Sequence, residues 1–449
     1  MSLAIDGLVS GLDTTSLINS LMQLEAVPQN LLKNKVTASQ AYISALQGLN
    51  AKVATLGDTA QATAKAKALD LFSTTSSFDK VVATATTGAQ PGEIDLVVGR
   101  LAQAQKSVTA AMSVWADDPP ELTITGADGT QTRVTAASTS LDDVASAINA
   151  AGAGVSATKV AVGGGEFRLQ LSSAGTGAAG AFSVARGSAT GADVFAEPGA
   201  ATVRVAADAE ITLWAGSAAA QTITSSTNTF ENLLPGVAVT VAAASTDPVT
   251  IGIARDDTAI AAVAASLVTG LNDIFSLIKA RSAVTTGTSS TGATTSSGGA
   301  FSGDSTVRDV NQRIMSAAIA PIGGKSPSEY GIVVTKTGTI EFNAEKFAAA
   351  LAKDPAATQA ALQGIAARVE VAATTISDRF DGLLTARITG QQSSVRDLSD
   401  RISDWDLRLN ARRTTLERVY SALEVQLSAL NAQSSYLQSQ LSSLSGSSS

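Results

Sequence analysis

Leucine recurs at helical spacing in the carboxyl-terminal part of the chain, and this pattern constrains the fold more than any other feature. Residues 425–449 carry no charge, yet apolar side chains follow one another there by three, four or seven positions. With the segment before it, the stripe comprises Val395, Leu398, Ile402, Trp405, Leu409, Leu416, Val419, Leu423, Leu427, Leu430, Leu437, Leu441 and Leu444. This is the a/d seam of a coiled coil. A single helix cannot bury such a seam, so the carboxyl terminus is predicted to assemble with another helix or with other subunits.

Two irregularities mark this seam. Arg412 falls on it between Leu409 and Leu416, where a polar residue commonly sets register or partner choice. The spacing then slips to three, four and four at Val419 and Leu423, a stutter that locally unwinds a left-handed supercoil. We expect a terminal stalk to make its contacts through Leu17, Leu21, Leu24, Leu409, Arg412, Leu416, Leu423, Leu427, Leu430, Leu437 and Leu441.

The amino-terminal part, residues 1–72, is also predicted to be helical. Asp13, or else Thr14 or Thr15, can cap a helix through Leu17, and Pro28 marks a break or a restart. A second heptad stripe then follows at Tyr42, Leu46, Leu49, Val53, Leu56 and Ala60. The two terminal stripes can pair with each other, which would close both chain ends into one stalk.

Composition excludes several classes of function. The chain has 449 residues with 45% apolar side chains, so it is globular and long enough for several domains. It lacks Cys and His, which rules out disulfides, thiol catalysis and any triad that needs an imidazole base. A formal net charge of −8 without a basic block argues against nucleic acid and against an anionic membrane surface.

No segment looks like a membrane span or a secretory signal peptide. The first basic residue is Lys33, so a positively charged region before an apolar run is missing. The longest apolar run, 259–268, is expected to be too short to cross a bilayer.

The middle of the chain, 78–256, changes to β-branched alternation. Strands are expected at 93–98, 122–125, 167–171, 210–213 and 237–241, with a hairpin turn at 127–130. One short helix is expected at 140–150. Helix returns after Asp256 or Asp257, and again after Asp304 or Ser305 and after Asp354-Pro355. Residues 282–300 are expected to form a mobile loop, and a small hairpin is expected around Thr337-Gly338.

Motifs for chemistry are weak. Gly323-Gly324-Lys325-Ser326 lacks the first glycine of a phosphate-binding loop, and Gly152 to Gly154 follows a helix rather than the strand that precedes a dinucleotide fingerprint. The carboxylate pairs Asp142-Asp143 and Asp256-Asp257 are explained by helix capping, whereas Asp117-Asp118 stays open. Scarce aromatics, 4% of residues, disfavour a glycosidase. No cofactor, metal ligand or catalytic residue is predicted.

The fold class that follows is multidomain α+β. It combines a helical coiled-coil stalk from both chain termini, a helical-bundle domain with a small β-hairpin, and inserted antiparallel β-rich head domains.

Several segments share their order and spacing with one family. They are Ile5–Asp13 followed by Leu17-Ile18, Val97–Gln105, Leu141–Gly177, Asn228–Asp256, Gly303–Thr306 and Leu427–Leu441. On these segments the chain resembles the flagellar filament cap family, hook-associated protein 2. The segment 141–177 is similar to the inserted module of some flagellins and hook proteins, whereas 114–119 and 175–201 depart from the pattern.

The resemblance implies a domain division. The stalk would be 1–45 with 395–449, and the helical domain with its hairpin 46–78 with 257–394. The inserted β-rich head would be 79–112 with 200–256, and the outermost module 113–199.

It also implies a non-enzymatic protein that forms a homo-oligomeric ring, most typically a pentamer, at the distal end of the flagellar filament. Such a ring retains exported flagellin and promotes its folding and insertion. Export through the flagellar type III apparatus with a chaperone, and an extracellular location without a cleaved signal peptide, are implied as well. The alternatives are another flagellar axial component, such as a flagellin-like or junction protein, or a surface adhesin; a hydrolase is disfavoured.

Overall fold

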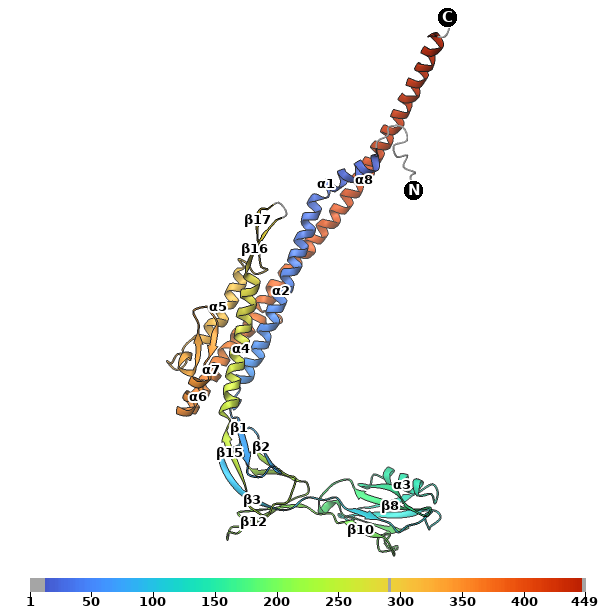
Figure 1. Ribbon diagram of the computed structural model, residues 1–449, viewed down its shortest axis with the longest axis vertical. Coiled ribbons are helices and arrows are strands. Elements are labelled where there is room, and N and C mark those ends of the chain that lie inside the picture. Colours follow the sequence, from blue (N-terminus) through green and yellow to red (C-terminus); the bar gives the residue numbers. More distant parts are fainter. Residues whose placement is uncertain (1–12, 290–291, 446–449) are drawn as a thin grey trace. The chain divides into compact units, whose positions relative to one another are not determined.

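The structure, a computed structural model, describes residues 13–289 and 292–445, with side chains to residue 442. The sequence motif at 5–12 and the side chain of Leu444 therefore lie outside the described residues. The chain divides into two compact units (Figure 1). The helical unit comprises residues 1–65 and 261–449, and the β unit comprises residues 66–260. The inserted middle and the shared terminal unit agree with the multidomain α+β class expected from the sequence.

The helical unit is built from long helices and two small hairpins. Its elements are α1 (Thr14–Glu25), α2 (Val27–Ala64), α4 (Asp257–Ser282), β16 (Val284–Thr288), β17 (Thr294–Gly298), α5 (Ser305–Ile319), the 3-10 helix η2 (Pro327–Tyr330), β18 (Ile332–Val334), β19 (Ile340–Phe342), α6 (Ala344–Lys353), α7 (Pro355–Ser377) and α8 (Leu383–Ser445).

Helix ends in this unit follow the capping signals in the sequence. The side chain of Asp13 accepts a hydrogen bond from the Ser16 backbone N–H at 2.7 Å, and Asp304 and Asp354 cap α5 and α7 in the same way. Pro28 lies in the first turn of α2, directly after the break at Ala26, as expected. These carboxylates satisfy backbone donors that have no partner within their helices.

The second heptad stripe forms the core of the helical unit. Leu46, Leu49, Val53, Leu56 and Ala60 of α2 are all buried. The backbone of α2 approaches α7 so closely at Gly57 that an added Cβ would lie 3.3 Å from Ala373 Cβ. This stripe therefore packs most extensively on α7, and the carboxyl-terminal stripe of α8 pairs instead with α1 and the first half of α2.

Helix α4 is the one described helix that is long and apolar enough to cross a membrane by length and composition, with a mean hydropathy of 1.6. The apolar character thus extends well beyond the run at 259–268. Its apolar side chains are used inside the helical unit, because Leu267, Leu271 and Ile274 are buried. Helix α4 is accordingly a core helix of the helical unit.

The expectation of a loop at 282–300 is wrong. Strands β16 and β17 pair antiparallel from Val284 opposite Gly298 to Thr288 opposite Thr294, and every residue of both strands is exposed. Threonine is β-branched and favours extended backbone, so backbone pairing forms without an apolar face. The Ser, Thr and Gly composition hides this tendency, because it is also the composition of flexible loops.

The β unit contains α3 (Leu141–Ala150) and antiparallel strands. They are β1 (Phe72–Ser76), β2 (Val81–Ala85), β3 (Gly92–Arg100), β4 (Lys106–Val108), β5 (Glu121–Gly126), β6 (Gln131–Thr135), β7 (Val155–Gly163), β8 (Glu166–Ser173), the 3-10 turn η1 (Ala178–Gly180), β9 (Phe182–Arg186), β10 (Ala201–Arg204), β11 (Ala209–Leu213), β12 (Gln221–Ser225), β13 (Thr229–Leu234), β14 (Val237–Val241) and β15 (Val249–Arg255). The five strands expected from the sequence are present as β3, β5, β8, β11 and β14. The helical expectation for 1–72 extended too far, because α2 ends at Ala64 and β1 begins at Phe72.

Two hydrophobic cores organise the β unit. The first lies between the sheet β1-β15-β3-β11-β12 and the sheet β13-β14-β2, and includes Leu96, Ile211 and Val239. The second joins α3 with the sheets β10-β4-β8-β7 and β6-β5-β9, and includes Leu122, Ile148 and Leu169. The turn at Asp128-Gly129 connects β5 and β6, as its sequence predicts.

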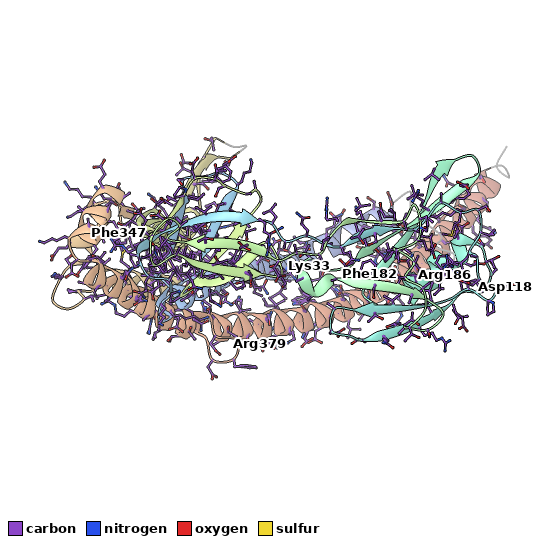
Figure 2. The ribbon with its side chains drawn as sticks, turned by 90° about the horizontal axis from the view of Figure 1, so that it is seen from below. Lys33, Asp118, Phe182, Arg186, Phe347 and Arg379 are labelled. Atoms are coloured by element: carbon purple, nitrogen blue, oxygen red, sulfur yellow. The ribbon has the colours of Figure 1, made fainter. Side chains whose placement is uncertain are left out.

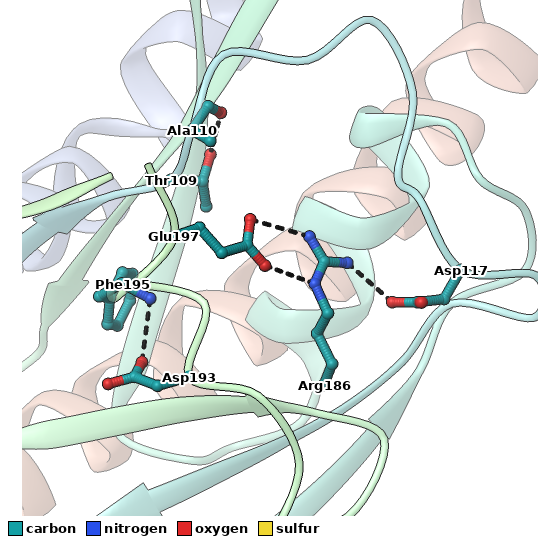
Figure 3. A network of polar contacts seen from close by, with 7 residues as sticks. All are labelled: Thr109, Ala110, Asp117, Arg186, Asp193, Phe195 and Glu197. Atoms are coloured by element: carbon teal, nitrogen blue, oxygen red, sulfur yellow. Dashed lines mark hydrogen bonds and ion pairs between the residues drawn. The ribbon is translucent and has the colours of Figure 1, made fainter. Parts of the chain in front are cut away.

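A polar network braces the second core at β9. The Arg186 guanidinium bonds Glu197 at 2.5 and 3.1 Å and Asp117 at 2.7 Å (Figure 3), and it lies 4.6 Å above the Trp115 ring. Arg186 and Phe182 are both carried by β9 (Figure 2). Hydrogen bonding to Glu197 raises the pKa of Arg186 above its usual value. The network gives Asp117 a structural partner, so the Asp117-Asp118 pair needs no catalytic explanation.

Candidate assembly interface

The two chain ends meet along α8. Arg412 Nε donates to Glu25 Oε1 at 3.0 Å, which joins α8 to the end of α1. The neighbouring Arg413 donates to the side-chain oxygen of Asn19. Arg412 therefore contacts the amino-terminal helix from the seam position that the sequence singled out.

Further along, α2 runs antiparallel to α8. Gln29 is 4% exposed and donates through Nε2 to Asp406 Oδ1 at 2.5 Å, while Lys33 Nζ donates to Gln29 Oε1 at 3.1 Å. Lys33 lies near the middle of the view in Figure 2. Ten residues later in α2, Ser39 Oγ accepts a hydrogen bond from Gln391 Nε2 at 3.1 Å. These bonds fix the register of the helix pair.

A polar cluster joins α2 and α8 to the start of α5. The Tyr42 hydroxyl of α2 donates to Asp304, the N-cap of α5, and Arg387 of α8 lies 3.3 Å from the hydroxyl and 3.6 Å from the carboxylate. Burial and the bond to Asp304 raise the pKa of Tyr42. Burial alone would raise the pKa of Asp304, but the Tyr42 hydroxyl, the Val307 N–H and Arg387 lower it overall. Three helices are thereby joined at one point.

The stalk residues named from the sequence divide into two groups. Leu21, Leu409, Leu416 and Leu427 are half-buried, whereas Arg412 is exposed apart from its contact with Glu25. The exposed apolar members are Leu17, Leu24, Leu423, Leu430, Leu437 and Leu441, with exposed fractions between 41% and 71%. For Leu430, Leu437 and Leu441 the reason is the length of α8, which continues past the start of α1 (Figure 1), so that its last turns have no described helix beside them.

Sequence reasoning missed other residues of this interface. Gln29 is buried between the helices, and a polar side chain gave no reason to place it there. Leu31 is 58% exposed and Leu407 is 70% exposed. Leu31 could have been found, since it lies seven residues after Leu24, whereas Leu407 is off the predicted seam.

Within residues 13–289 and 292–445, side chains of Asp and Glu do not gather in groups of three or more that could hold a metal ion. Gly323 and Gly324 have positive φ angles and form a tight turn before Ser326, which caps η2. The site that dominates the described structure is thus an exposed apolar helix surface.

Comparisons with known proteins agree on one family. The model of the flagellar hook-associated protein 2 carboxyl terminus matches residues 206–432, which is 227 of the 449 residues. The chain belongs to the flagellar hook-associated protein 2 family. The model of the amino terminus of the same family matches residues 10–105, and the flagellin hook IN motif matches 121–175, which spans β5 to β8.

Relatives in this family cover most of the chain. Flagellar hook-associated protein 2 of Escherichia coli O157:H7 is 29% identical, over 94% of this chain and 94% of its own length. A lateral flagellar hook-associated protein 2 of Vibrio parahaemolyticus is 27% identical over 63% of this chain and 61% of its own length.

A solved structure supports the arrangement of elements. The crystal structure of the D1-D2-D3 domains of the flagellar cap protein FliD from Escherichia coli is 25% identical and superposes with a TM-score of 0.54. It covers 78% of this chain and 96% of that chain. The resemblance stated from sequence motifs is thereby confirmed at the level of the family.

Proposed function

We propose that this protein caps the distal end of the bacterial flagellar filament as a homo-oligomeric ring that retains exported flagellin and promotes its folding and insertion. The observation that carries the proposal is the exposed leucine stripe at the end of α8, in a chain of the flagellar hook-associated protein 2 family. A cap needs a surface that only the assembly covers, and this stripe supplies one.

The physical argument concerns the last turns of α8. Leu430, Leu437 and Leu441 are each about 60–70% exposed and follow heptad spacing. Exposed leucines at regular spacing are costly in water, because burying each one stabilises by about 1.5–3 kcal/mol. Neighbouring subunits or the filament end would cover them, so folding of this segment would be coupled to assembly.

Finer assignments are part of the same proposal. The ring would be a pentamer, the partners would be flagellin, a flagellar export chaperone and the type III export apparatus, and neither nucleic acid nor a membrane would be bound. The protein would act outside the cell at the filament tip, without a cleaved signal peptide, and would have no enzymatic activity. The stalk residues named from the sequence would make the assembly contacts.

The domain division is proposed on the same basis. The stalk would comprise 1–45 and 395–449, the helical domain 46–78 and 257–394, the β-rich head 79–112 and 200–256, and the outermost module 113–199. The outermost module contains the second hydrophobic core of the β unit, which supports treating it as a separate part.

The test is genetic. Deletion of the gene in its own bacterium should release soluble flagellin into the medium and leave hooks without filaments, and the full chain supplied in trans should reverse both effects. Filaments of normal length after deletion would refute the cap and favour a minor axial subunit or an adhesin.

A matched pair of variants locates the effect. A chain with Leu430→Ser, Leu437→Ser and Leu441→Ser should fail to restore filaments, because it removes the apolar stripe and keeps the helix length. A chain with Ser434→Ala, Ser435→Ala and Ser442→Ala, on the same exposed helix, should restore them.

A further inference from the structure

Two exposed surfaces lie on opposite sides of the paired helices at the chain ends. The first, called here the leucine–lysine face, consists of Leu24, Val27, Leu31 and Lys35 on α1 and α2. The second, called the leucine–aspartate face, consists of Asp400, Asp404, Leu407 and Ala411 on α8. All eight side chains are exposed, and Leu24 and Leu407 reach 71% and 70%.

Helix geometry places the leucine–lysine face away from α8. Gln29 marks the side of α2 that contacts α8, because it is buried there and bonds Asp406. Leu31 follows Gln29 by two residues, which is a rotation of about 200° around the helix. Lys35 lies one turn beyond Leu31 on the same outer side.

The leucine–aspartate face points in the other direction. The half-buried seam of α8, with Trp405 and Leu409, faces the amino-terminal helices. Leu407 lies two residues from each of them, again about 200° around the helix. Asp404 and Asp400 precede Leu407 by three and seven residues, so they share its outer side. The helix pair is therefore a ribbon with a different apolar surface on each side.

The two faces also occur at the same level along the ribbon. Cross-helix bonds pair Glu25 with Arg412 and Gln29 with Asp406, so Leu407 stands at the level of residues 25–29. It is therefore flanked by the levels of Leu24 and Leu31.

Lys35 and Asp400 also lie at similar positions along the axis of the helix pair. The bond between Ser39 and Gln391 marks the next level down the ribbon, and Asp400 lies between this level and that of Gln29. Lys35 falls in the same interval on α2.

The charges on the faces are complementary. Lys35 stands beside an apolar surface and has no acid within one turn of α2. Asp400 and Asp404 stand beside Leu407 and have Arg396, Arg401 and Arg408 within one turn of α8. The ion pairs found in the described part of the chain do not involve Lys35, Asp400 or Asp404. Lys35 on one face and the two aspartates on the other thus carry opposite charges and stay outside the ion pairs of the described chain.

We propose that the leucine–lysine face of one copy docks on the leucine–aspartate face of the next copy. The occupant of each face is a second copy of this chain, and this inference rests on the proposed ring. In a closed cyclic ring the subunits are parallel, so residues at the same level meet, and different faces of neighbouring copies make a heterologous contact. Leu407 then packs between Leu24 and Leu31 of its neighbour, and Lys35 approaches Asp400.

Charge substitutions on the full-length chain test the pairing. Lys35→Asp or Asp400→Lys alone should raise the dissociation constant of self-association about tenfold, because each puts like charges opposite each other. Sedimentation velocity measures this constant. The double variant Lys35→Asp with Asp400→Lys should recover most of the loss, since attraction is restored with reversed signs. Single variants that associate like the wild type, or a double variant weaker than both, would overturn the pairing.

A mixing experiment tests whether the contact is heterologous. Leu31→Glu destroys one face and Leu407→Glu destroys the other, so each variant alone should stay monomeric. Mixed together they retain one intact pair of faces, and they should form a one-to-one dimer but no ring. Val371→Glu on α7, where Val371 is also exposed, is the control and should assemble normally. Circular dichroism checks that each variant is folded.

The outcomes separate this inference from the cap itself. A wild-type chain that stays monomeric at every concentration, or variant mixtures that stay monomeric, would overturn the interface. Variants that assemble normally but no longer retain flagellin would assign these faces to flagellin instead. Filament loss on gene deletion would leave the cap standing in each case.

Discussion

Gly331 is a position where backbone conformation and close packing both require glycine. It ends η2 in the left-handed region with φ 77°, and an added Cβ would lie 2.5 Å from the Asn343 carbonyl oxygen. Gly338, in the turn between β18 and β19, has the same φ of 77° but open space where a Cβ would stand. Comparing the two glycines separates the free-energy cost of a left-handed backbone from the cost of a steric clash at the added Cβ.

Replacing each glycine by alanine should therefore give unequal losses of stability. Gly338→Ala should lower the free energy of unfolding by about 1 kcal/mol, the cost of a left-handed alanine. Gly331→Ala should cost more, about 2–3 kcal/mol, because the backbone must also shift. Urea denaturation of both variants measures the difference, and equal losses would contradict the close approach.

Asp304 makes the stability of the helical unit depend on pH. Its carboxylate is 10% exposed, bonds the Tyr42 hydroxyl, and caps α5 through the Val307 N–H at 2.8 Å. Its pKa is lowered in the folded chain, so the charged form stabilises the fold above the ordinary carboxyl pKa of about 4. That contribution is lost as the pH falls below this value towards the folded pKa.

Asp304→Asn should keep the cap and remove the charge. At pH 7 the variant should be about 1–2 kcal/mol less stable than the wild type, since bonds to a charged group are lost. The gap should narrow as the pH falls below about 4, because the wild-type carboxyl then becomes neutral as well. Guanidinium unfolding at pH 7 and pH 3 measures it; a gap that is constant with pH would argue against a lowered pKa.

At the scale of elements, α8 has two environments along its length. Residues 391–409 contact α2 and have a half-buried seam, whereas 428–442 are exposed throughout. An isolated helix of ordinary sequence is marginal in water, because packing rather than propensity supplies most of its stability. The same helix should therefore differ in local stability between its two halves.

Hydrogen exchange on the free subunit should show this difference. Amides in 428–442 should exchange at least tenfold faster than amides in 391–409, and the buried stretch of α2 around Leu49 should be the slowest. On assembly into a ring the 428–442 amides should become protected. Equal protection of both halves in a monomeric sample would contradict the account.

Particular elements show how far the sequence predicts this fold. Helix starts at Asp13, Asp304 and Asp354 were predictable because a capping carboxylate acts within three residues. The hairpin β16–β17 was not, because its Thr, Ser and Gly residues suit a loop equally well. Capping side chains show where helices begin, because they act locally. The Thr, Ser and Gly composition of a segment does not show whether it forms a β-hairpin or a loop.

The sequence also did not predict which helices pack against each other. The stripe from Leu46 to Ala60 was recognised, yet nothing in its spacing says that α7 rather than α8 covers most of it. For the candidate interface, the exposed leucines of α8 were predicted as a seam. The burial of Gln29 and the exposure of Leu407, which is off the seam, were found only in the structure. Heptad periodicity identifies a face and leaves the identity of its neighbour open.

At the scale of the molecule, the helical unit and the β unit have separate sets of buried side chains, and those of the β unit form the two hydrophobic cores described above. Leu46 in α2 and Leu96 in β3 are both fully buried, at 0% exposure, in different units. Burying a leucine in either core stabilises only the unit to which that core belongs. Thermal unfolding should therefore show at least two separable transitions, one for the helical unit and one for the core of the β unit that contains Leu96.

Leucine-to-alanine variants should identify the transitions. Leu46→Ala should lower the transition of the helical unit by about 2–5 kcal/mol of unfolding free energy and leave the other in place, because it removes packed methyl groups and leaves a cavity. Leu96→Ala should do the reverse for the β unit. Differential scanning calorimetry of the full-length chain, with Val371→Ala as an exposed control that moves neither transition, gives the assignment. If either core variant shifted both transitions equally, the two units would unfold as one cooperative block, and an assembly protein could not loosen its stalk while its head stays folded.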